Sequence, residues 1–167
     1  HEAFVNRLVH GLAKAAIPLV FFGLRGMTRR LEATDLYVAA LVIYGFGAIS
    51  VMCAAVASGF VATNVMEKML ASDGATRDTY HALLTYTGIL NQAFAKVHVV
   101  ATSAAFMLWG IAIERSRTLG RAVGVAGLCI GGAALLALLS GHLRLDVHGF
   151  GIVVALQAVW LIWIGVL

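Results

Sequence analysis

The sequence predicts an all-α integral membrane protein, a bundle of five transmembrane helices that forms a single domain over residues 1–167. Composition is the first reason: 61% of the residues are hydrophobic and only 12% are charged, about half the charged fraction of a typical soluble domain. The second is that the apolar residues come in long runs, which indicates a lipid environment. No alternating segments of about ten residues indicate a β-barrel, so helices are the expected spanning structure.

Five apolar runs are long enough to span a bilayer: Leu8–Leu24, Leu36–Thr63, Ile89–Ile113, Ala122–Gly141 and His148–Leu167. Between the second and third runs, Asn64–Leu70 and Asp78–Thr87 read as helical extensions around the turn Ser72–Gly74. Their charged residues make them too polar for lipid, so we expect an extracytoplasmic helical hairpin.

Loop charge sets the expected orientation. Three arginines follow the first span and three follow the third, around Arg29 and Arg115, whereas the other two loops share three basic residues. The positive-inside rule places the Arg29 and Arg115 loops in the cytoplasm, and a bacterial cytoplasmic membrane is the expected location. Trp109, Trp160 and Trp163 approach the same face and are interpreted as an interfacial aromatic belt.

This orientation puts the first residue outside, although no signal segment precedes the first span. We therefore expect the mature chain to have lost a signal peptide or a sixth, N-terminal helix. The net charge of +4 follows from the basic cytoplasmic loops, which suit anionic lipids and require no nucleic acid. Cys53 and Cys129 lie in different spans and form no metal-type pair.

The six histidines all fall toward the outer side of the threaded bundle, and a membrane histidine is a candidate functional residue by default. At a rise of about 1.5 Å per residue, His10 and His98 lie at similar depths in the outer third of the bilayer. His142 and His148 lie near the outer boundary. Imidazoles bind Cu, Zn and Fe, and two of them can hold a b-type haem. The candidate metal ligands are therefore His10, His98, His142 and His148.

Lys14 and Asn91 complete the expected polar site. Lys14 lies near the bilayer centre with no Asp or Glu at its depth, so either neutral neighbours or an anionic ligand are expected beside it. Asn91 shares a helix face with His98 at a spacing of seven residues. The ordinary alternative is that these side chains only form hydrogen bonds inside the bundle.

Gly120, Gly124, Gly127 and Gly131 form one smooth helix face, which fits either internal packing or contact with a second copy or another subunit. Known catalytic and phosphate-binding motifs are absent. Three function hypotheses stay open: a module that binds a metal or haem, an accessory subunit of a membrane complex, and a small transporter or sensor for an organic anion. An enzyme acting on lipid or quinone is a fourth.

Overall fold

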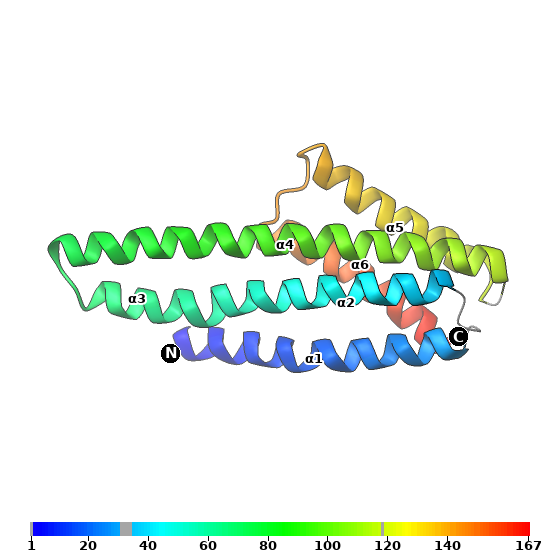
Figure 1. Ribbon diagram of the computed structural model, residues 1–167, viewed down its shortest axis with the longest axis horizontal. Helices are drawn as coiled ribbons and strands as arrows, with labels where there is room; N and C mark the ends of the chain where they lie inside the picture. Colours follow the sequence, from blue (N-terminus) through cyan, green and yellow to red (C-terminus); the bar gives the residue numbers. More distant parts are fainter. Residues whose placement is uncertain (1, 31–34, 118) are drawn as a thin grey trace.

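The computed structural model describes residues 2–30, 35–117 and 119–167, and all of the secondary structure in these ranges is helical (Figure 1). The elements are α1 (Glu2–Arg30), α2 (Asp35–Val56), the π-helical segment η1 (Ala57–Val61), α3 (Ala62–Leu70), α4 (Gly74–Ser116), α5 (Arg121–Leu139) and α6 (Val147–Val166). Four helical stretches in the described residues are long and apolar enough to cross a membrane: Asp35–Leu70, Gly74–Ser116, Arg121–Leu139 and His148–Val166. The all-helical class is therefore confirmed, and these four helical stretches have the length and composition of membrane spans. Helix α1 is not among the four.

Helix α4 is the central element. Its 43 residues give a length of about 64 Å, roughly twice the hydrocarbon thickness of a bilayer. It buries 61% of its most apolar window, against 22% for α5 and for α6. Alanine, serine and threonine make up much of its buried face, so neighbouring helices can approach it closely.

Helices α2, η1 and α3 form one continuous arm that packs along α4 (Figure 1). The wide π turn at Ala57–Val61 contains Gly59, and Thr63 donates a hydrogen bond to the Gly59 carbonyl at 2.9 Å. Helix α4 begins at Gly74, after Asp73 in extended backbone, and is unbroken into the span. The extension predicted from Asp78 therefore starts four residues too late, because Gly74 adopts a φ of +51° and turns the chain directly into the helix.

A cluster of aromatic rings fills the core where α2, α4 and α6 meet. Trp109 and Trp160 are 0% and 1% exposed, and their ring centroids lie 6.4 Å apart. Phe106 packs against both of them. The predicted aromatic belt is therefore wrong for Trp109 and Trp160, because sequence depth does not show which side of a helix faces the core. Only Trp163 of the three is exposed.

The connection between α5 and α6 folds back onto α4. Leu145 is buried, and its carbonyl accepts a hydrogen bond from Gln92 Nε2 at 3.0 Å. Asp146 then caps α6 by accepting a hydrogen bond from the Gly149 N–H at 2.8 Å. This hydrogen bond lowers the pKa of Asp146 below its ordinary value of 3.8, because it stabilises the carboxylate.

Candidate functional site

Two reciprocal hydrogen bonds fix α2 against α4 in the apolar part of both helices. His98 of α4 lies with Nδ1 2.9 Å from the carbonyl oxygen of Gly47 in α2. One turn away, Ser50 of α2 donates to the carbonyl of Phe94 in α4 at 2.9 Å. Each helix thus binds the backbone of the other through a side chain, and we call His98, Gly47, Ser50 and Phe94 the α2–α4 clasp.

The His98 ring is held in one orientation. It is 8% exposed, and its centroid lies 5.7 Å from that of Phe150 in α6. A carbonyl oxygen only accepts hydrogen bonds, so Nδ1 carries the proton, and Nε2 is the ring nitrogen with a free lone pair in the neutral imidazole. Nε2 has no hydrogen-bond partner among the described residues.

A second polar contact ties α6 to α4 one turn further along. Gln157 Nε2 donates to Thr102 Oγ1 at 3.0 Å, and Thr102 donates in turn to the His98 carbonyl at 2.9 Å. All three residues are buried. The Oγ of Ser103 and the Nε1 of Trp109 are buried nearby without a partner in the described part of the chain. The polar residues of α4 thus serve mainly to position α2 and α6.

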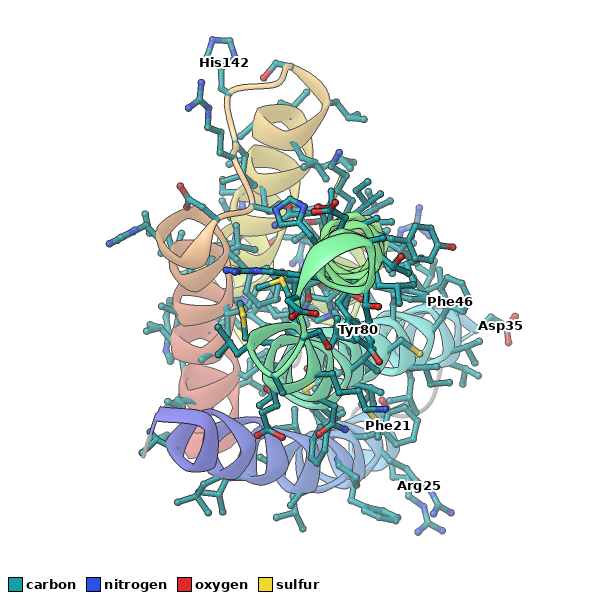
Figure 2. All side chains as sticks on the ribbon, turned by 90° about the vertical axis from the view of Figure 1, so that its left-hand side faces the viewer. Phe21, Arg25, Asp35, Phe46, Tyr80 and His142 are labelled. Atoms are coloured by element: carbon teal, nitrogen blue, oxygen red, sulfur yellow. The ribbon has the colours of Figure 1, made fainter. Side chains whose placement is uncertain are left out.

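His142 and His148 do not join this cluster. Both are exposed. His142 Nδ1 lies 2.9 Å from the Ser140 hydroxyl at the tip of the α5–α6 loop, where Figure 2 shows His142 projecting from the rest of the molecule. Asn91 is half-buried two turns before His98. No group of three or more His, Cys, Asp or Glu side chains suited to a metal ion occurs among the described residues. Of the four predicted histidine ligands, the three with described side chains, His98, His142 and His148, therefore do not come together as a metal site.

The side chains of His10 and Lys14 lie outside the described residues, although their backbone belongs to α1. The helix register can still be compared. Phe21 packs over Gly45, where an added β-carbon would lie 3.0 Å from the ring. His10 lies eleven residues before Phe21 in α1, whereas Gly47 lies only two residues after Gly45 in α2. The backbone of His10 is therefore closer to the α3–α4 turn than Gly47 and His98 are. The shared site of His10 and His98, expected from their similar depths in the sequence, stays a prediction.

The glycine face of α5 is used inside the molecule. A β-carbon at Gly131 would lie 2.5 Å from the Ser103 carbonyl of α4, and one at Gly127 would lie 2.8 Å from the Trp160 ring. Gly124 contacts Gly110 and Glu114 of α4 in the same way. Gly124, Gly127 and Gly131 are thus covered by α4 and α6, and their smooth face serves packing inside the molecule. Gly120 instead supplies the positive φ of +82° before α5.

Helix α5 packs closely along α4, whereas α6 lies nearer to α5 and reaches α4 mainly through long side chains such as Gln157 and Trp160. An apolar groove of about 330 Å³ lies between α5 and α6. Cys129, Ala133 and Ala137 recur at a spacing of four residues along one wall of this groove, so they form a ladder of small side chains. The full lining is Cys129, Ile130, Ala133, Ala134, Ala137, Leu143, Ile152, Val153 and Leu156. The four-residue spacing of these small residues is present in the sequence, but from the sequence the glycine face of the same helix is interpreted as the contact surface instead.

Comparison with known protein families, with curated proteins and with solved structures finds no match to this chain.

Proposed function

We propose that the protein is an accessory subunit of a membrane protein complex, and that it binds a transmembrane helix of its partner in the groove between α5 and α6. The observation that carries the proposal is the shape of that groove. Its walls are apolar, its two helices diverge, and one wall carries the Cys129–Ala133–Ala137 ladder. Small residues at this spacing let a helix backbone approach closely, and such approach drives helix association in lipid.

The proposal includes α1 as a fifth span. Leu24 and Thr28 of α1 are buried against the bundle, so α1 is packed along the membrane-spanning part of α2. Leu12, Leu19 and Phe22 are 64%, 71% and 63% exposed. Large apolar side chains exposed to this extent along one helix fit a lipid environment.

We also propose that the ends of α1 and α4, next to Arg29 and Arg115, face the cytoplasm. The ends of both helices and the start of α5 lie at one end of the molecule, opposite the α3–α4 turn (Figure 1). Their arginines then follow the positive-inside rule of a bacterial cytoplasmic membrane. A cysteine placed at Asp73 should react with an impermeant maleimide on intact cells, whereas one placed at Arg29 should not.

The groove can be tested through its own thiol. Cys129 is exposed and lines the groove, and Cys53 is half-buried in α2. In a Cys53→Ser background, a maleimide-linked photoreactive group on Cys129 should cross-link a specific membrane protein when native membranes are illuminated. The same protein should co-purify at a fixed ratio in mild detergent.

A matched pair of substitutions identifies the contact surface. Ala133→Leu fills the groove and should reduce co-purification of the partner. Ala39→Leu places the same side chain at an exposed position of α2 and should leave co-purification unchanged. Equal yields of the partner from both variants would reject the groove as its binding site, and a cross-link to a second copy of this chain alone would replace the partner subunit with a homodimer.

A second candidate function is binding of a metal ion or haem b by His98. The specific observation is that Nδ1 donates to the Gly47 carbonyl and leaves Nε2 without a partner in the described residues. Histidine ligands commonly donate their other ring N–H to a carbonyl in this way. Protein purified from its native membranes should then show a Soret band or bound copper, zinc or iron. Either signal should vanish in His98→Ala and persist in His81→Ala, and its absence from the native protein would reject this candidate.

A further inference from the structure

A polar cavity opens where α4 ends and α5 begins. It has a volume of about 590 Å³ and is lined by Ile113, Glu114, Arg117 and Arg121. Both arginines are exposed, and the cavity lies at the end of two apolar helices that are long enough to span a membrane. In a bilayer, a cavity at this position is at the level of the lipid headgroups.

The backbone at Arg117 gives no reason for an arginine there. Arg117 ends α4 in the left-handed conformation, with φ of +55°, and its N–H donates to the Ile113 carbonyl at 2.9 Å. Glycine is the usual residue at such a helix end, because a side chain makes this conformation unfavourable. The presence of an arginine at this strained backbone position indicates a role for the Arg117 side chain.

Arg121 lies beside the cavity, within ion-pair distance of Glu114. Its Nε lies 3.6 Å from Glu114 Oε2, a long contact for an ion pair, and its side chain is 88% exposed. Glu114 Oε1 is buried without a partner in the described residues, in space that exists only because residue 124 is glycine. The weak ion pair with Glu114 therefore leaves most of the hydrogen-bonding capacity of the Arg121 guanidinium unused.

The first turn of α5 adds to the positive potential of this cavity. Gly120 precedes the helix and has no side chain to cap it. The free N–H groups of a first turn attract anions. The residues that line the cavity thus include two arginines and a single acidic residue, Glu114, next to the start of α5.

We infer that this cavity binds the phosphate of an anionic phospholipid, with Arg117 and Arg121 as the cationic groups. Guanidinium groups match phosphate oxygens in geometry and charge. The lipid is the source that the position favours, because its acyl chains would continue along the apolar surface of the adjoining spans. The inference is independent of the partner proposed for the α5–α6 groove.

The test uses thermal unfolding of the purified chain in neutral detergent, with phosphatidylglycerol, phosphatidylcholine or inorganic phosphate added. Phosphatidylglycerol should raise the Tm in a saturable manner, because a ligand that binds only the folded state stabilises it. Phosphatidylcholine and phosphate should raise it little. The Arg117→Gln/Arg121→Gln variant should lower the apparent lipid affinity about fivefold for each arginine, the size expected for a basic group at an anionic surface.

Two controls make the result decisive. The Arg77→Gln/Arg144→Gln variant loses the same charge at the opposite end of the bundle and should keep the full shift. Arg117→Gly should raise the Tm without lipid, since it relieves the left-handed strain, yet still weaken the lipid-dependent shift. Equal losses in both double variants would mean general attraction to anionic lipid and would overturn the site, and a shift of equal size with inorganic phosphate would overturn the lipid as its ligand.

Discussion

Two neighbouring glycines of α5 provide a direct test of how this helix packs. A β-carbon at Gly131 would lie 2.5 Å from the Ser103 carbonyl and 2.9 Å from the Met107 side chain, whereas one at Gly132 would meet nothing within 4 Å. Gly131→Ala and Gly132→Ala therefore add the same methyl group to the same helix. They differ only in what that methyl group contacts.

The expected magnitudes follow from this difference. Replacing glycine by alanine in a helix interior gains up to about 1 kcal/mol in either variant. For Gly131→Ala, the added methyl must withdraw by roughly 1 Å to reach ordinary contact, and the Ser103 carbonyl is backbone that cannot rotate away. Overpacking of this kind costs about 1–3 kcal/mol. We therefore expect Gly132→Ala to be neutral or stabilising and Gly131→Ala to be about 1–3 kcal/mol less stable than Gly132→Ala.

Both variants can be compared with the parent chain by thermal or denaturant unfolding in one detergent, followed by circular dichroism. The tryptophan core provides an independent fluorescence signal, because Trp109 and Trp160 are buried. If the two variants unfold at the same point, or if Gly131→Ala is the more stable, α5 does not rest on α4 through this face and the helix arrangement is wrong.

Three further changes test other contacts. Trp160→Phe should destabilise the fold by about 0.5–1.5 kcal/mol in the same unfolding assay, because the indole N–H no longer donates its 2.9 Å hydrogen bond to the Val123 carbonyl. His98→Ala should cost a similar amount, since the Gly47 carbonyl loses its contact, and a change confined to a ligand spectrum would contradict this structural role. The Asp146 carboxylate should stabilise α6 fully above its ordinary pKa of 3.8 and lose this effect as the pH falls through its lowered folded-state pKa; Asp146→Asn should flatten that part of the stability–pH profile.

The sequence predicted the helices well because bilayer thickness imposes long apolar runs on any membrane helix. Four of the five predicted runs correspond to helical stretches that are apolar enough to span. Depth along a helix was harder to predict. The register of Phe21 on Gly45 sets α1 against α2, and no count of residues from a charged loop reveals such a side-chain contact.

Orientation around each helix was the second limit. A hydrophobic run in a membrane gives little indication of which side faces the core, because lipid-facing and core-facing residues are both apolar. Trp109 and Trp160 were therefore assigned to an interface although they form the core. Polar residues carried more information, since lipid offers them no partners, and His98 does face the interior as its helix face predicted.

The α2–α4 clasp explains why a histidine is kept in the centre of an apolar bundle. Close packing of small residues holds α2 and α4 together, but similar residues one turn away would permit a shifted pairing. The clasp does not permit a shifted pairing of α2 and α4, because His98 reaches the Gly47 carbonyl only when Ser50 also lies beside Phe94. Slipping α2 by one turn, about 5.4 Å, would bring Ile43 or Val51 to the place of Gly47. Their branched side chains would then collide with α4, because even an added β-carbon at Gly47 would lie only 3.1 Å from Ala101. The clasp thus selects one register of the helix pair on which α5 and α6 then pack, whatever ligand or partner the protein binds.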